Sequence, residues 1–186
     1  GSLKGVHGTM IIRENISLKP YNTFGIDVNA KYFISVSSIS ELQHVLVNNK
    51  GIKKLIIGGG SNILFTEDIE GLVIHLNTKG IKLRSTGDTT VVVSVAAGEN
   101  WHDFVLWSLK NDFGGVENLS LIPGNVGTAP IQNIGAYGVE LKDIFDSCEA
   151  IDLATGNIKT FLKSECDFGY RESIFKNKLK NEYIIL

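Results

Sequence analysis

The sequence predicts a fold that combines helices with strands, built as one large domain or two small lobes. Its 186 residues are enough for either arrangement. Hydrophobic residues make up 43% of the chain and charged residues 20%, a balance typical of a protein with a packed core. Glycine occurs 20 times and proline only 3 times, which favours tight backbone geometry over disorder. Short apolar β-type runs alternate with two amphipathic helical stretches along the chain.

The first part of the chain predicts strands on both sides of a helix. Residues 31–36, 53–57 and 71–76 are apolar runs of β-type composition, so we expect a strand in each. Ser38 or Ser40 suits the N-cap of the helix between the first two. The apolar stripe of that helix follows the i, i+3, i+4 spacing and consists of Leu42, Val45 and Leu46.

After a turn near residues 78–80, the chain predicts two further strands and a second helix. The strands are expected at residues 81–84 and 90–96. Asn100 is the expected N-cap of the helix, which ends before Gly114. Its predicted apolar stripe consists of Trp101, Phe104, Val105 and Leu109.

The last part predicts a hairpin and a final strand. Residues 148–153 and 158–161 are expected to pair across a turn, and residues 163–167 to form a helical turn. The chain ends at residues 183–186 inside an apolar β-type run, which predicts a piece of a longer protein. We expect residues 1–9 to be an artificial leader, residues 10–78 a first lobe and residues 79–186 a second lobe.

A glycine-rich stretch at residues 122–138, IPGNVGTAPIQNIGAYG, carries the main functional signal. It has no charged residue and no period of 2 or 3.6, yet apolar anchors recur along it. Glycine at such sites allows the backbone to approach a flat or phosphorylated ligand where a Cβ would collide. The alternative is a long surface loop that is merely rich in glycine.

A second glycine-rich loop follows the expected strand at residues 53–57. It consists of Gly58, Gly59, Gly60, Ser61 and Asn62. Successive backbone N–H groups in such a turn form an anion-binding nest. The loop lacks the Lys-Ser/Thr of a P-loop and the third glycine of the dinucleotide fingerprint, so an ordinary turn stays open. A dinucleotide lying between two lobes would explain both loops, with backbone donors holding its phosphates because neither loop contains a cation.

Tyr170 and Arg171 place a phenol and a guanidinium beside Gly169. Arginine offers a planar fork that binds a carboxylate through two hydrogen bonds. The alternative is a surface arginine paired with Glu172.

Other function classes find little support. The net charge is −2 and the basic residues are scattered, so no nucleic-acid footprint is visible. No apolar run reaches the roughly 18 residues of a membrane helix. Cys148 and Cys166 are expected to be reduced thiols of a cytosolic protein. The histidines share no metal-ligand spacing, and no Ser-His-Asp set can be located, so no metal site is expected.

Several of these motifs together resemble one family. They are NTFGI at residues 22–26, GGGSN at 58–62, AGENWHDFV at 97–105, ENLSLIPGNVGTAPIQNIGAYGVEL at 117–141 and ECDFGYRESIFK at 165–176. In these stretches the chain resembles the UDP-N-acetylenolpyruvoylglucosamine reductases (MurB) of peptidoglycan synthesis. The resemblance covers most of residues 20–186.

The resemblance implies an α+β, two-lobed FAD-binding fold of the vanillyl-alcohol-oxidase (PCMH) type. FAD would be bound non-covalently, with Gly58, Gly59, Gly60, Ser61 and Asn62 at the pyrophosphate. The implied flavin-side residues are Ile122, Pro123, Gly124, Gly127, Thr128, Ile131, Gly135, Ala136, Tyr137 and Ile185. Tyr170 and Arg171 match the substrate-side pair of the family, with Arg171 as the catalytic candidate.

The implied activity is that of a cytoplasmic oxidoreductase of cell wall biogenesis, needed for cell shape and division. NADPH would supply hydride, through the flavin, to the enolpyruvyl group of UDP-N-acetylglucosamine enolpyruvate. We expect a monomer that binds neither nucleic acid nor membranes.

The resemblance also implies a C-terminal substrate domain, absent here, that carries the proton donor and most UDP contacts. This chain is therefore expected to bind FAD without turnover. Another flavin oxidoreductase of the same fold, or a non-catalytic flavin-binding module, stays open.

Overall fold

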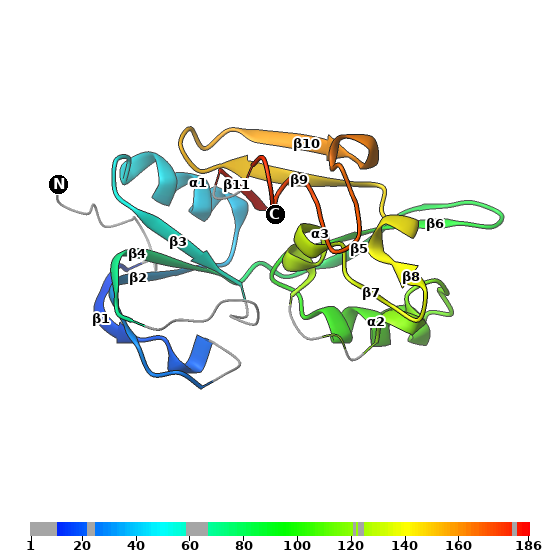
Figure 1. The fold of residues 1–186 in the computed structure, drawn as a ribbon, viewed down its shortest axis with the longest axis horizontal. Coiled ribbons are helices and arrows are strands. Elements are labelled where there is room, and N and C mark those ends of the chain that lie inside the picture. The colour runs from blue at the N-terminus through cyan, green and yellow to red at the C-terminus, as the bar shows by residue number, and fades with distance from the viewer. Residues whose placement is uncertain (1–10, 22–24, 59–66, 121, 123–124, 180–181) are drawn as a thin grey trace.

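The computed structural model describes residues 11–21, 25–58, 67–120, 122, 125–179 and 182–186. Figure 1 shows two halves side by side, with the C-terminus near the middle of the molecule. In the described part of the chain, no helix is long and apolar enough to cross a membrane.

The first half is a four-stranded sheet in the order β1-β2-β4-β3. Strands β2 (Asn29–Val36), β4 (Ile69–Leu76) and β3 (Lys54–Ile57) run parallel, which confirms the three predicted strands. Strand β1 (Arg13–Ser17) adds an antiparallel edge that the sequence did not predict. Because β3 and β4 are parallel, the loop that follows β3 leaves the same edge of the sheet as the segment that follows β4.

Helix α1 (Ile39–Asn48) connects β2 to β3 and covers one face of this sheet. Ser38, not Ser40, is its N-cap, with the side chain accepting a hydrogen bond from Glu41 N. The predicted stripe of Leu42, Val45 and Leu46 is fully buried. On the opposite face, Phe33, Ile57 and Val73 pack beneath the 3-10 turn Lys19–Tyr21.

The second half begins with the predicted hairpin, strands β5 (Ile81–Thr86) and β6 (Val91–Val95), which projects from the body in Figure 1. Helix α2 (Trp101–Lys110) follows, and Asn100 caps it as predicted. The predicted stripe is wrong at Leu109, which is 46% exposed, whereas Ser108 is buried. Ser108 fits the buried side because its hydroxyl donates to the Phe104 carbonyl.

The glycine-rich stretch and its flanks, residues 117–143 and here called the central stretch, fold into short elements where they are described. They are the 3-10 turns Glu117–Leu119, Val126–Thr128 and Leu141–Asp143, helix α3 (Ala129–Gln132), and strands β7 (Gly135–Ala136) and β8 (Val139–Glu140). Side chains from this stretch, including Leu119, Ala129 and Leu141, pack against Trp101 and Val105 of α2. The stretch is therefore a packed unit, not a loop lying on the surface.

The last sheet has the order β10-β9-β11. Its strands are β9 (Ser147–Asp152), β10 (Ile158–Leu162) and β11 (Tyr183–Ile185), all antiparallel, which confirms the predicted hairpin and final strand. The 3-10 turn Lys163–Glu165 confirms the helical turn after β10.

Helix α1 is shared by the two halves. Its buried stripe belongs to the same apolar cluster as Ile151 of β9, and Ile184 and Leu186 pack against that cluster. The Gln43 amide also donates to the Gly156 carbonyl at 3.1 Å. The division into lobes at residue 78 stays a prediction, because this core continues across it.

Candidate functional site

The two glycine-rich segments meet at Gly58 and Asn125. Gly58 follows β3, and a Cβ placed on it would lie 3.5 Å from the Asn125 side-chain nitrogen. Asn125 is buried and forms an isolated β-bridge with Asn100. Gly59, Gly60, Ser61, Asn62, Pro123 and Gly124 lie outside the described residues. The start of the first loop thus lies against Asn125 of the central stretch, 67 residues further along the chain.

Gly127 fixes the central stretch to residues 97–99. Its N–H donates to the Ala97 carbonyl at 3.0 Å, and Val126 N donates to the Glu99 carbonyl at 2.8 Å. A Cβ on Gly127 would lie 2.6 Å from the Ala97 Cβ. Real Cβ atoms do not approach this closely, so the position requires glycine.

Residues 78–80, which connect the two halves, bind the same short segment. Thr78 Oγ1 accepts from Gly98 N at 3.2 Å, and Lys79 Nζ donates to the Gly98 carbonyl at 2.7 Å. Gly80 N donates to the Glu99 carboxylate at 2.8 Å. Residues 97–99 therefore form hydrogen bonds both to residues 78–80, which connect the two halves, and to the central stretch.

Arg171 reaches back to the central stretch. Its Nη2 donates to the Gly135 carbonyl at 2.6 Å, and its Nη1 to the Asn133 carbonyl at 3.4 Å. A Cβ on Gly135 would lie 2.6 Å from Nη1, so glycine leaves the space that the guanidinium occupies. Arg171 also has a φ of +52°, a left-handed conformation that costs an L-residue about 1–2 kcal/mol. Such strain is concentrated at functional sites.

Glu140 is the carboxylate nearest to Arg171, at 4.0 Å between Oε2 and Nη1. Glu172, the partner that the sequence offered as the alternative, pairs with Lys176 at 3.8 Å. The alternative pairing is therefore wrong in its partner, because Glu172 pairs with Lys176 and Arg171 lies beside Glu140.

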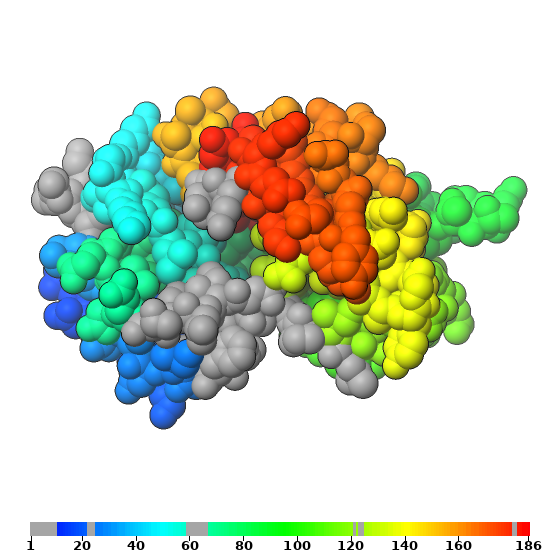
Figure 2. Space-filling model, viewed as in Figure 1, coloured from blue at the N-terminus to red at the C-terminus, as the bar shows by residue number. Residues whose placement is uncertain are grey.

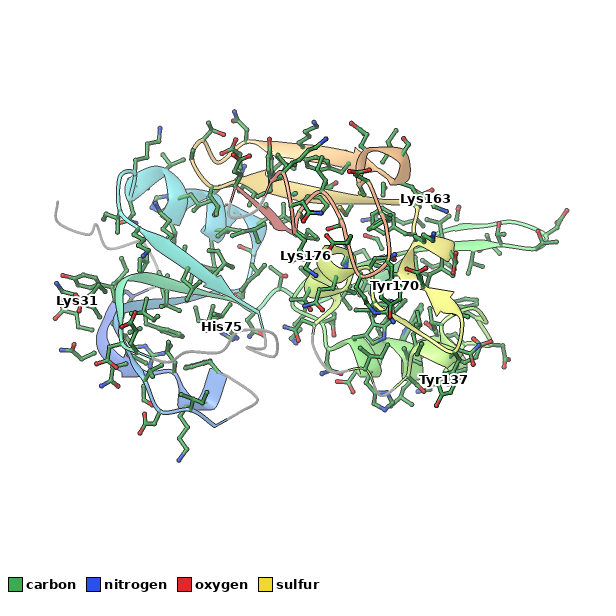
Figure 3. All side chains as sticks on the ribbon, viewed as in Figure 1. Lys31, His75, Tyr137, Lys163, Tyr170 and Lys176 are labelled. Carbon is green, nitrogen blue, oxygen red and sulfur yellow. The ribbon has the colours of Figure 1, made fainter. Side chains whose placement is uncertain are left out.

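Two predicted tyrosines are highly exposed. Tyr170 is 81% exposed and its ring lies 5.0 Å from the Arg171 guanidinium carbon. Tyr137 is 89% exposed at the tip of the β7-β8 hairpin, where it has a φ of +52°. Figure 3 shows Tyr170 near α3 and Tyr137 at the outer edge of the second half.

Asn133 is one residue beside Arg171 that the sequence analysis did not single out. It is completely buried, has a φ of +43° and caps α3. Its amide donates to Glu140 Oε2 at 2.6 Å and to the Gly169 carbonyl at 2.9 Å, and its Oδ1 accepts from Lys142 N at 2.9 Å. One side chain thus joins three segments. An asparagine after a short helix, where left-handed backbone is common, was the only available signal.

Ser173 is a second residue that was missed. It is completely buried, and its hydroxyl donates to the Ile131 carbonyl at 2.6 Å. The segment that carries Tyr170 and Arg171 is thereby tied to α3 as well as to Gly135. Figure 2 shows this segment lying against the central stretch on the displayed face.

The other predicted flavin-side residues are mostly packed inward. Ile122 and Ala136 pack against the apolar cluster that includes Trp101 of α2. Ile185 belongs to the cluster around Phe161, and Ile131 packs against it. The Thr128 hydroxyl donates to the Asn125 carbonyl at 2.8 Å. These side chains pack inside the protein, so the groups of the central stretch that remain for a ligand are mainly backbone N–H and carbonyl groups.

A cavity of about 520 Å³ lies between β6, α3 and the β9-β11 pair. Gly127 and Ile185 line it, whereas Gly58, Tyr170 and Arg171 are not among its described lining residues. The predicted residues therefore do not all line this cavity: Gly127 and Ile185 do, whereas Arg171 contacts Gly135 and Asn133.

His75 lies at the end of β4, half-buried beside Tyr21, with 4.9 Å between ring centroids. Its Nδ1 is 3.0 Å from Ser35 Oγ. Burial, and then the positive charge of Lys79, lower the pKa of His75 below its ordinary value. We find no cluster of three or more metal-binding side chains among the described residues.

Cys148 and Cys166 are free thiols packed in one apolar cluster. A hydrogen bond to Cys166, and then burial, raise the pKa of the Cys148 thiol, which keeps it protonated.

The fold and these contacts define a class of protein. The chain matches the FAD binding domain family over residues 30–161, and it belongs to that family. Two of its curated relatives carry the same enzyme name. The chain is 59% identical over 176 residues to the UDP-N-acetylenolpyruvoylglucosamine reductase of Flavobacterium johnsoniae, covering 95% of this chain and 52% of the relative. It is 51% identical over 179 residues to the reductase of the same name from Amoebophilus asiaticus, covering 95% of this chain and 53% of the relative.

Solved structures agree with these matches. The reductase (MurB) of Thermus caldophilus superposes with a TM-score of 0.72 at 25% identity, covering 95% of this chain and 60% of that chain. p-Cresol methylhydroxylase superposes with a TM-score of 0.59 at 13% identity, covering 92% of this chain and 36% of that one, which shows a shared fold. The predicted α+β fold of the PCMH type and the resemblance to the FAD-binding portion of the reductases are confirmed. The chain spans about half the length of the curated relatives it matches.

Proposed function

We propose that this chain binds FAD and forms the cofactor portion of an NADPH-dependent reductase. The whole enzyme would convert UDP-N-acetylglucosamine enolpyruvate to UDP-N-acetylmuramate for peptidoglycan synthesis. The observation that carries the proposal is the proximity of Gly58 and Asn125, which places the start of one side-chain-poor segment beside the other. Since these segments are remote in sequence, a ligand that spans both is the simplest reason for their shared glycine content.

The described residues fit an FAD molecule. Gly58 follows a strand, and among the described residues the Asn125 side-chain nitrogen lies 3.5 Å and the Leu76 carbonyl oxygen 3.7 Å from the position that a Cβ on Gly58 would take. No cation occurs in residues 58–62 or 122–138, so backbone N–H groups would hold the pyrophosphate. The proposed cofactor-binding residues are Gly58, Gly59, Gly60, Ser61, Asn62, Ile122, Pro123, Gly124, Gly127, Thr128, Ile131, Gly135, Ala136, Tyr137 and Ile185. FAD, when bound, would supply hydride transfer to the enolpyruvyl carbon.

Arg171 would bind the substrate carboxylate. Arginine carries five N–H donors, and the carbonyls of Gly135 and Asn133 engage two of its nitrogens. The side chain keeps 35% of its surface exposed, so donors remain for an anionic ligand. Hydride addition places negative charge on the α-carbon and its carboxylate, and a fixed guanidinium stabilises that charge as it develops. Tyr170, beside it, would orient the substrate through its hydroxyl.

The chain by itself would bind FAD without turnover, because it spans only about half of its relatives. The whole enzyme would be cytoplasmic, since its proposed donor and nucleotide-sugar substrate are cytoplasmic metabolites, and we propose that it is a monomer.

The first experiment is a visible absorption spectrum of the purified chain after incubation with FAD and gel filtration. Bound oxidised flavin in the protein peak is the expected result. A colourless protein that is folded by circular dichroism overturns FAD binding. In the full-length protein, NADPH oxidation must depend on the UDP-enolpyruvyl substrate; oxidation that ignores this substrate would indicate a different flavin enzyme.

A further inference from the structure

Arg171 sits at the corner of a short turn whose base is closed by two hydrogen bonds. Gly169 N donates to the Glu172 carbonyl and Glu172 N to the Gly169 carbonyl, both at 3.1 Å. Lys176 Nζ donates to the Arg171 carbonyl at 3.0 Å. The turn fixes the Arg171 backbone, but the position of its guanidinium depends on groups from other segments.

Asn133 supplies much of that environment. Its side-chain nitrogen donates to the Gly169 carbonyl at the base of the turn, and its own carbonyl accepts from Arg171 Nη1. Asn133 is completely buried, and the orientation of its amide follows from its partners, since Nδ2 faces two acceptors and Oδ1 faces the Lys142 N–H.

The same amide also holds the Glu140 carboxylate. Asn133 Nδ2 donates to Glu140 Oε2 at 2.6 Å, while that oxygen lies 4.0 Å from Arg171 Nη1. Charge-assisted arginine–carboxylate hydrogen bonds are normally about 2.7–2.9 Å long. Glu140 is therefore close enough to attract the guanidinium but does not form the tight two-bond pair that would occupy it.

Other charged side chains near Arg171 and Glu140 have ion-pair partners. Lys142 Nζ lies 3.9 Å from Glu140 Oε1, and Glu172 pairs with Lys176 at 3.8 Å. Glu140 is the one carboxylate within 4.0 Å of Arg171 among the ion pairs of the described residues. It is thus the group that could compete with an anionic ligand for the guanidinium.

We propose that Asn133 is a positioning residue that holds the Glu140 carboxylate away from Arg171, so that Arg171 keeps donors free for a carboxylate ligand. The ligand's identity as the enolpyruvyl carboxylate rests on the function proposed above. Without the Asn133 amide, Glu140 Oε2 loses its short hydrogen bond and moves onto the guanidinium. Removing the Glu140 charge should then restore ligand binding, which a purely structural role for Asn133 does not predict.

The test uses the full-length, FAD-loaded enzyme and three variants: Asn133→Gly, Glu140→Gln and the double variant. Glycine tolerates the φ of +43° at position 133, so the backbone can be kept. The dissociation constant for UDP-N-acetylglucosamine enolpyruvate is measured from the change in flavin absorbance without NADPH, alongside KM and kcat. Asn111→Gly is the control, because Asn111 also caps a helix and its amide donates to the Trp107 carbonyl at 2.8 Å.

We expect Asn133→Gly to weaken substrate binding about tenfold or more, equivalent to about 1.4 kcal/mol, with flavin content unchanged. Glu140→Gln should bind substrate at least as tightly as the parent, and the double variant should recover most of the lost affinity. Equal dissociation constants for the substrate in Asn133→Gly and in the double variant would overturn the inference. A parent enzyme that binds FAD but does not bind this substrate would overturn the proposed function instead, and the two failures are distinguishable.

Discussion

Gly127 lies so close to Ala97 that a Cβ on Gly127 would be 2.6 Å from the Ala97 Cβ. Gly127→Ala should therefore force the central stretch away from residues 97–99 and weaken the hydrogen bond from Gly127 N to the Ala97 carbonyl. We expect a loss of about 1–3 kcal/mol in the free energy of unfolding, as for other overpacked sites. FAD retention should fall in the same variant. Urea denaturation and the flavin absorbance of the gel-filtered protein measure the two effects.

Gly114→Ala is the matched control for that substitution. A Cβ on Gly114 meets no atom within 4 Å, and its φ lies outside the left-handed region. This variant should keep the stability and the flavin content of the parent. Equal losses in both variants would mean that the Gly127–Ala97 approach is not what limits substitution.

Trp101→Phe tests the link between α2 and the central stretch. The indole Nε1 donates to the Leu119 carbonyl at 2.9 Å, and Trp101 is only 2% exposed. Phenylalanine retains most of the apolar contact but leaves a buried carbonyl without its donor, which costs about 1–3 kcal/mol. Thermal unfolding should show a Tm lower by several degrees. Trp107→Phe, on the same helix and only half-buried, should change Tm less; a similar drop in both would contradict this account.

His75 predicts an acid-sensitive contribution to stability. Its folded-state pKa is lowered below 6.5, so between these two values the unfolded chain binds more protons than the folded one. The stabilisation is complete above pH 6.5 and is lost as the pH falls from there toward the folded-state pKa. His75→Gln should flatten the dependence of Tm on pH in that window. A His44→Gln variant is the control for removing an imidazole elsewhere, and an unchanged slope in His75→Gln would refute the assignment.

Arg171→Lys in the full-length enzyme should lower kcat far more than FAD affinity. A lysine ammonium can bind one carbonyl but cannot reproduce the planar fork that reaches both Gly135 and Asn133. Stopped-flow rates of substrate reduction and flavin titration give the two quantities. Parallel losses of turnover and FAD affinity would show that the arginine serves the fold rather than the substrate.

Local sequence signals predicted most of the elements correctly. Asn100 could be recognised as an N-cap, and the cap of α1 could be narrowed to Ser38 or Ser40, because a cap depends only on the next three residues. The strands β2, β4 and β3 could be recognised from composition, because strands that are covered on both faces are apolar throughout. Strand β1 was missed because three of its five residues are exposed and Asn15 has a φ of +52°, so neither apolar composition nor alternation marks it.

The candidate site was only partly predictable. Glycine spacing indicated Gly58, Gly127 and Gly135, but no sequence pattern links Asn133 to Gly169, 36 residues away, or selects Glu140 over Glu172 beside Arg171. Those choices depend on tertiary contacts. The same limit applies to Leu109. Its spacing fits the apolar stripe of a helix, but in the structure Ser108 is buried and Leu109 is exposed.

Helix α1 packs both on the first sheet and on Ile151 of β9, so one buried apolar cluster joins the two halves on that side. Hinge rotation would have to expose fully buried leucine and valine side chains. Nucleotide binding would therefore leave α1 packed between the first sheet and β9, and amide exchange in α1 should be equally slow before and after FAD loading.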